Sequence, residues 1–143
     1  MQKPSQGSCE RTGRGMSTTE YLIDTNILIY HTKGLHAASK FIDEVIARQG
    51  FNISILTQIE FLGWEKHTVE GFRKCRRLIE LANVYSIDED IAEKAIDLKK
   101  RAKIKLADAV IAATALVNNL KLATRNVDDY KAVKDLEILN PFA

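Results

Sequence analysis

The sequence predicts an α/β fold, a three-layer sandwich in which helices cover both faces of a mainly parallel sheet. Short β-prone runs alternate along the chain with longer segments of helical periodicity, which is typical of units with right-handed crossovers between parallel strands. The 143 residues, of which 45% are hydrophobic, suit one globular domain with a sizeable core. No internal repeat indicates a second domain.

Five short runs rich in branched and aromatic residues predict the strands of this sheet. They lie at residues 21–23, 51–55, 84–87, 120–123 and 136–139. Asn140 and Pro141 follow the last run and close it. Each run is short enough to be a buried strand of one parallel sheet.

Helical periods fill the intervals between these runs. One apolar stripe consists of Ala37, Phe41, Val45 and Ile46, and another of Ile91, Ala95, Leu98 and Ala102. Residues 106–120 are apolar nearly all round and include five alanines. This composition predicts a central helix that packs closely against the sheet.

Residues 1–19 are rich in Ser, Gly, Thr and charged residues and have no apolar period. They predict a disordered leader or an upstream extension, with Met16 as an internal start, and leave residues 20–143 as the folded domain. No apolar run reaches the roughly 18 residues that span a bilayer. The first twenty residues also lack the apolar stretch of a signal peptide, so we expect a cytoplasmic protein that does not bind membranes.

The net charge of +2 comes from the leader. Lys3, Arg11 and Arg14 stand there against Glu10, so the rest of the chain is neutral. Any affinity for nucleic acid must therefore depend on local clusters such as residues 73–77 and 99–105. Solvated helix faces are the simpler explanation of such clusters.

Asp24, Glu60 and Asp108 each follow or open an apolar element, at predicted junctions between strand and helix. Such junctions gather along the carboxyl edge of a parallel sheet, where open α/β folds build their sites. Crowded carboxylates repel one another unless they are protonated or share a cation. Because no Cys or His lies close by in sequence, the oxygen-rich set suits Mg²⁺ or Mn²⁺ rather than Zn²⁺, and the chemistry most often run at such sites is phosphodiester hydrolysis.

Each acidic residue also has a purely structural explanation. Asp24 can cap a helix, and Asp108 can complement a helix dipole. Residues 57–60, Thr-Gln-Ile-Glu, have the pattern of a capping box. Thr124, Asn126 and Asp129 could cap the last helix. Capping alone does not require these side chains to converge.

Five stretches, in this order and spacing, resemble PIN-domain ribonucleases and most of all their VapC-type toxins. They are LIDTN at 22–26, SILTQIE at 54–60, KLADAVIAATA at 105–115, ATRNVDDY at 123–130 and NP at 140–141. The resemblance covers residues 21–143. It implies that residues 20–143 form a PIN domain.

The resemblance implies roles for single residues. Asp24, Glu60 and Asp108 would be catalytic and ligate Mg²⁺ or Mn²⁺. The fourth acidic position of the family falls on Asn126, which would also be catalytic and can coordinate through its side-chain oxygen. Because Asn126 has no charge, Asp129 would complete the acidic pocket as a further metal ligand. Two more residues, Asn26 and Thr124, would orient ligands and water, while Lys105 and Arg125 would contact RNA phosphates unless they are merely solvated.

By the same resemblance, the protein would be a metal-dependent endoribonuclease and the toxin of a type II toxin–antitoxin pair. It would cut tRNA or ribosomal RNA and be held inactive by a VapB-like antitoxin. A homodimer is expected, with Phe61, Leu62, Trp64 and Phe72 as a candidate surface that could equally be core. The alternatives are a non-catalytic PIN-fold module that binds RNA or protein, and a phosphoacceptor receiver domain, whose paired acids and late Lys the sequence lacks.

Overall fold

A computed structural model describes residues 20–143 and contains one five-stranded sheet in which every pairing is parallel. The strands are β1 (Tyr21–Ile23), β2 (Phe51–Ser54), β3 (Asn83–Tyr85), β4 (Lys121–Ala123) and β5 (Ile138–Leu139). Their spatial order is β3-β2-β1-β4-β5. Along the chain, β2 and β3 are added on one side of β1, and β4 then pairs with β1 on its other side. The strand order therefore reverses between β1 and β4.

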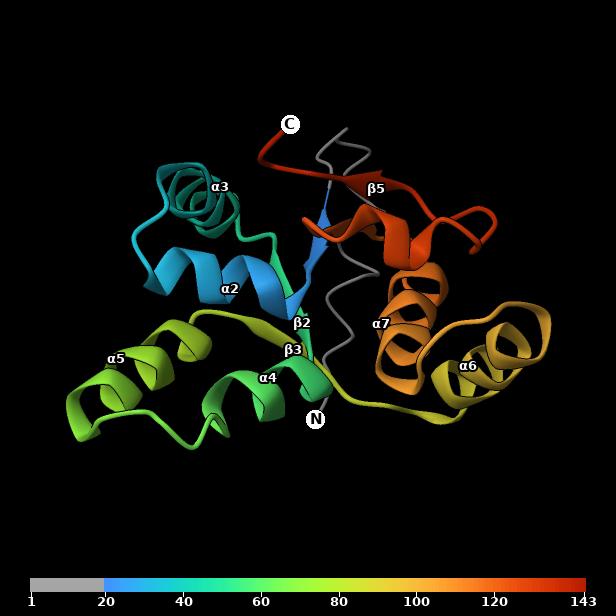
Figure 1. Ribbon diagram of the computed structural model, residues 1–143, viewed down its shortest axis with the longest axis horizontal. Helices are drawn as coiled ribbons and strands as arrows, with labels where there is room; N and C mark the ends of the chain where they lie inside the picture. The colour runs from blue at the N-terminus through green and yellow to red at the C-terminus, as the bar shows by residue number, and fades with distance from the viewer. Residues whose placement is uncertain (1–19) are drawn as a thin grey trace.

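Six helices and one 3₁₀ turn connect the strands. They are α2 (Thr25–Thr32), α3 (His36–Ala47), α4 (Ile55–Leu62), α5 (Val69–Glu80), α6 (Glu89–Arg101), α7 (Leu106–Val117) and η1 (Val127–Tyr130). Figure 1 shows α2, α3 and α5 on one side of the sheet and α6 and α7 on the other. The predicted three-layer α/β sandwich is confirmed.

Two apolar cores lie on the two faces of the sheet, and β1 separates them. Leu22 packs into the core with α6 and α7, whereas Ile23 packs into the core with α2 and α3. Both side chains are fully buried, as the alternation of a strand requires. The helix α7 buries every residue from 109 to 115, mostly alanines, so it lies close against the sheet as the composition predicted.

The predicted strands and helices are all present, but several ends differ. The run at 51–55 stops at Ser54 because the Ser54 hydroxyl caps α4. The helix predicted to reach residue 120 ends at Val117, and Asn119 then adopts a left-handed φ of 56°. Asn tolerates that conformation better than most residues, which lets the chain turn into β4.

The predicted leader, residues 1–19, lies outside the described residues. Within residues 20–143, none of the helices combines the length and the apolar character that crossing a bilayer needs.

Candidate active site

Asp24 lies where β1 ends and α2 begins, beside the reversal of strand order. Its backbone N–H donates to the Ala123 carbonyl at 2.9 Å, which fixes it against the end of β4. Its Oδ1 atom accepts the Thr25 N–H at 2.8 Å, so the capping role proposed for Asp24 is confirmed. Only 8% of the residue is exposed, although Asp is rarely buried this far without partners.

The other carboxylate oxygen of Asp24, Oδ2, accepts hydrogen bonds from three side chains. The donors are the Thr124 hydroxyl at 2.9 Å, the Tyr130 hydroxyl at 3.0 Å and the Asn26 amide at 3.2 Å. The same Asn26 amide also donates to the Thr124 hydroxyl oxygen at 3.0 Å. The structure thus brings Asn26 and Thr124, two residues predicted to orient ligands, into direct contact with Asp24.

Tyr130 lies between two acids of the site, Asp24 and Asp108. Its hydroxyl lies 3.0 Å from Asp24 Oδ2 and 3.3 Å from Asp108 Oδ1, and the residue is only 1% exposed. The sequence assigned Tyr130 no function. An aromatic residue after a polar turn resembles any core residue, and nothing in its spacing reveals that the hydroxyl faces two carboxylates 106 and 22 positions away.

Burial and repulsion between carboxylates raise the pKa values of two carboxyl groups of this site, Asp24 and Asp108. Burial, opposed by its hydrogen bonds and reinforced by the charge of Asp108, raises the pKa of Asp24. The pKa of Asp108, in the first turn of α7, is also raised, first by burial and then by the charges of Asp129 and Glu60. The pKa of the Tyr130 phenol is raised far above its usual range by burial and by these two acids. A cation would relieve this repulsion.

Glu60 lies on α4, and its carboxylate accepts a hydrogen bond from Thr25, the first residue of α2. The Thr25 hydroxyl lies 2.6 Å from Glu60 Oε1 and 3.1 Å from the Thr57 hydroxyl oxygen. The capping box expected over residues 57–60 is wrong, because α4 begins at Ile55 and the Ser54 hydroxyl accepts the Leu56 N–H at 3.0 Å. Glu60 is therefore free of a capping duty, and Thr25 and Thr57 are contacts that the sequence did not reveal.

Asn126 and Asp129 lie on the exposed side of the site. The Asn126 N–H donates to the Thr124 hydroxyl oxygen at 3.0 Å. Its side chain makes no capping bond to η1, so the cap proposed for Asn126 is wrong. The negative charge of Asp129 raises the pKa of Asp108.

The oxygen donors of the site suit a hard divalent cation such as Mg²⁺ or Mn²⁺. Asp24 and Asp108 meet at Tyr130, but no three His, Cys, Asp or Glu side chains between residues 20 and 143 are close enough to hold an ion as they stand. Glu60 and Asp129 are both exposed, whereas Asp24 is buried and Asp108 is half-buried. The residues fit a metal in the chemistry of their oxygen donors, and two of the four predicted ligands, Asp24 and Asp108, share the Tyr130 hydroxyl.

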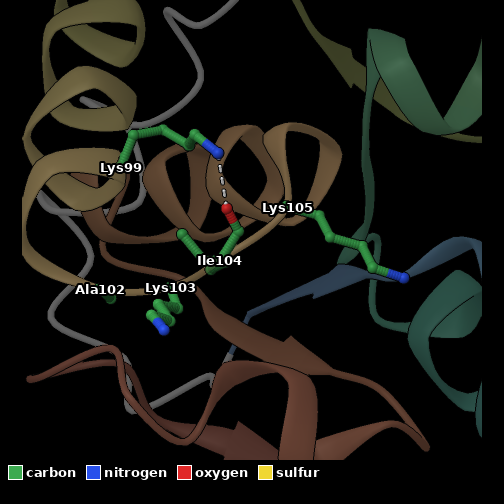
Figure 2. A pocket seen from close by; sticks show the side chains of 5 residues that line it. All are labelled: Lys99, Ala102, Lys103, Ile104 and Lys105. Carbon is green, nitrogen blue, oxygen red and sulfur yellow. Dashed lines mark hydrogen bonds between the residues drawn. The ribbon is translucent and has the colours of Figure 1, made fainter.

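Lys105 lies at the start of α7, beside a hollow of ≈ 500 Å³ lined by Lys99, Ala102, Lys103, Ile104 and Lys105. Figure 2 shows Lys99 turned back toward the Ile104 carbonyl, to which it donates at 2.8 Å, while Lys105 extends away from it. The positive charge of Lys105 lowers the pKa of Asp108, which places the ammonium near the acidic group. The contact of Lys105 with RNA stays a prediction.

Arg125 also lies beside the site. Its backbone N–H donates to Asn26 Oδ1 at 3.1 Å, and its guanidinium lies over the rings of Tyr30 and Phe142. Those two rings pack against the core of α2 and α3, whereas the loop of Lys105 packs against the core of α6 and α7. The neighbours of the two cations thus pack into the cores on opposite faces of the sheet.

The comparisons with known proteins agree with this geometry. The profile of the PIN domain family matches residues 21–136. The chain is 34% identical to Ribonuclease VapC10 of Mycobacterium tuberculosis over 127 residues, which cover 85% of this chain and 92% of that protein.

Solved structures show the same likeness. A toxin–antitoxin complex from Klebsiella pneumoniae contains a chain that is 31% identical, with a TM-score of 0.69 and coverage of 85% of this chain and 98% of that one. VapBC-1 from nontypeable Haemophilus influenzae follows at 28% identity and a TM-score of 0.70, covering 87% and 100%. The fold, the order of its motifs and these matches lead to one conclusion: the chain belongs to the PIN domain family.

Proposed function

We propose that the protein is a metal-dependent endoribonuclease and the toxin of a type II toxin–antitoxin pair. The observation that carries this proposal is the pair of Asp24 and Asp108, whose carboxylates meet at one hydroxyl on the carboxyl edge of the sheet. Ribonuclease VapC10, a relative at 34% identity, supports the choice of RNA as substrate. Membership of the PIN family makes a receiver domain untenable.

Four acids would hold Mg²⁺ or Mn²⁺, with Asp24 and Asp108 already together and Glu60 and Asp129 rotating in. A bound ion of this kind supplies an activated water and neutralises charge on the phosphate. Asn126 offers a neutral side-chain oxygen at the edge of the site.

The remaining residues of the site keep this chemistry in place. Asn26, Thr124 and Tyr130 fix the orientation of Asp24 through its Oδ2 atom. On the two sides of the acids, Lys105 and Arg125 would bind phosphates of the RNA strand.

The partners follow from the relatives. Because the similar chains were solved within toxin–antitoxin complexes, we infer a VapB-like antitoxin that blocks the site. A structured RNA such as tRNA or ribosomal RNA is the proposed substrate, and the cytoplasm is the proposed location.

For the proposed homodimer, Trp64 and Phe72 are the exposed part of the candidate surface, since they are 56% and 37% exposed while Phe61 is buried. Trp64 lies beyond the end of α4 at Leu62 and does not belong to the core.

The test is cleavage of total cellular RNA by the purified protein freed of antitoxin. Reactions contain Mg²⁺, Mn²⁺ or EDTA, and Asp24→Asn is compared with Asp43→Asn, which makes the same charge change on the exposed surface of α3. We expect discrete fragments that require the metal and Asp24 but not Asp43. If folded protein cleaves nothing under any condition, the non-catalytic module that binds RNA or protein becomes the better explanation.

A further inference from the structure

Arg125 is exposed, yet its side chain is held in one place by two aromatic rings. The centre of its guanidinium lies 4.4 Å from the Phe142 ring and 4.8 Å from the Tyr30 ring. The rings themselves meet edge to face, with centroids 5.2 Å apart. A long surface side chain normally samples many rotamers, so this stacking removes freedom that binding would otherwise have to remove.

The last turn of the chain builds one wall of this arrangement. The Phe142 N–H donates to Asn140 Oδ1 at 2.9 Å, and the Ala143 N–H donates to the Asn140 carbonyl at 3.1 Å. These bonds fold the tail back after β5, so that Phe142 reaches Tyr30 on α2. The Asn-Pro pair at the end of the sequence thus places an aromatic side chain beside the acidic site.

Among residues 20–143, no acid forms an ion pair with Arg125. The ion pairs there join Arg73 with Glu70 and Arg101 with Asp97. Stacking uses the face of the guanidinium and leaves the N–H groups at its edge available. A planar fork of N–H donors matches the oxygens of a phosphate.

We infer that Tyr30, Phe142 and Arg125 form a clamp, here called the Arg125 clamp, that presents a preorganised guanidinium to a phosphate of single-stranded RNA beside the acidic site. The inference rests on the proposed ribonuclease function. A strand of RNA is favoured over an acidic protein segment because the loop before Lys105 packs into one core of the sheet and the rings beneath Arg125 pack into the other, so a polyanion that crosses the acidic site would meet both cations. Tyr30 and Phe142 are positioning residues that act through Arg125.

The first measurement is the salt dependence of RNA binding. Fluorescence anisotropy of a short, mixed-sequence, single-stranded RNA reports the binding. Binding is measured in EDTA, so that cleavage does not interfere. Loss of one phosphate contact in Arg125→Gln should reduce the slope of log affinity against log salt by about 0.7. Arg48→Gln is the matched control, because it removes the same charge from the residue after α3, ahead of β2 and at the opposite edge of the sheet.

The second measurement tests whether Phe142 acts through Arg125. Phe142→Leu keeps an apolar side chain but removes the ring, and should weaken RNA binding about two- to fivefold. In the Arg125→Gln background the same change should have no further effect, whereas Phe142→Tyr should bind like the wild type. Additive losses in the double variant would overturn the clamp.

The outcomes separate this inference from the proposed function. If the wild type cleaves RNA with metal while Arg125→Gln keeps the wild-type salt slope, the clamp is wrong and the nuclease stands. If nothing is cleaved while the slope falls as expected, the clamp stands and the nuclease is wrong. Unchanged RNA binding by Arg125→Gln, together with lost binding of polyglutamate, would overturn the inference in favour of a protein partner.

Discussion

The Tyr130 hydroxyl has one proton and two carboxylate acceptors. It lies 3.0 Å from Asp24 and 3.3 Å from Asp108, so the shorter bond goes to the more buried acid. A donor shared in this way holds two like charges near one another before any cation arrives. At the scale of single residues, Tyr130 is therefore as much a part of the site as the acids are.

Replacing Tyr130 with Phe should lower both stability and activity. Because the lost donor serves a buried carboxylate, we expect the free energy of unfolding in urea to fall by about 2 kcal/mol. Cleavage should weaken as well, since Asp24 loses one of three donors on Oδ2. Tyr21→Phe at the opposite end of β1 is the control. Equal losses in the two variants would show that the Tyr130 hydroxyl has no special role.

Asp108→Asn should abolish metal-dependent cleavage without loss of stability. The pKa of Asp108 is raised by burial and by the charges of Asp129 and Glu60, so its ionised form destabilises the fold and a neutral amide does not. We expect the urea midpoint without metal to stay or rise relative to wild type. Asp43→Asn, on an exposed surface, should change neither property. A variant that cleaves normally would remove Asp108 from the proposed metal ligands.

At the scale of elements, the start of α4 decides where Glu60 points. The helix begins at Ile55 with Ser54 as its cap, three residues earlier than a capping box at residues 57–60 would place it. Thr57 then lies inside the helix, fully buried, and its hydroxyl meets Thr25 instead of a backbone N–H. This earlier start leaves the Glu60 carboxylate to Thr25 and to the acidic site.

Ser54→Ala tests this assignment. Loss of the cap should lower the free energy of unfolding in urea by about 1 kcal/mol, because the Leu56 N–H loses its acceptor. Ser86→Ala, in the exposed loop before α6, provides the comparison and should have almost no effect. If the two variants unfold at the same urea concentration, the cap of α4 lies elsewhere.

At the scale of the whole molecule, several site residues come to one edge of the sheet because β1 lies between β2 and β4. Asp24 follows β1, Glu60 lies on the helix after β2, and Asn126 and Asp129 follow β4. Parallel strands put all these connections at one edge of the sheet. The sheet therefore concentrates negative charge that the isolated segments would keep apart.

This concentration predicts how stability depends on pH. The pKa values of Asp24 and Asp108 are raised above the ordinary value of 3.8. Their contribution to stability is fully present below that value and is lost as the pH rises through the raised values. In EDTA, the wild type should therefore lose stability relative to Asp108→Asn over the pH range that begins at the ordinary value of 3.8 and extends upward through the raised pKa values.

Mg²⁺ should restore the wild type at the upper end of this range, because binding to the folded state alone adds stability. The measurement is the free energy of unfolding in urea for both proteins at several pH values, with and without Mg²⁺. A constant difference between the two proteins across the range would contradict the raised pKa values. A gain from Mg²⁺ that is equal in Asp108→Asn would contradict its role as a ligand.

The sequence by itself determined the α/β class, the five strands and the central α7, because these depend on periodicity. Of the three acids predicted at junctions between strand and helix, only Asp24 lies at one, whereas Glu60 lies within α4 and Asp108 lies in the first turn of α7, which follows α6. Only the tertiary structure decided what those residues contact. The hydroxyl of Tyr130 on two acids, the contact of Thr25 with Glu60, and Phe142 stacked on Arg125 each join segments far apart in the chain. Such contacts follow from how the elements pack, and local pattern carries no information about packing between distant segments.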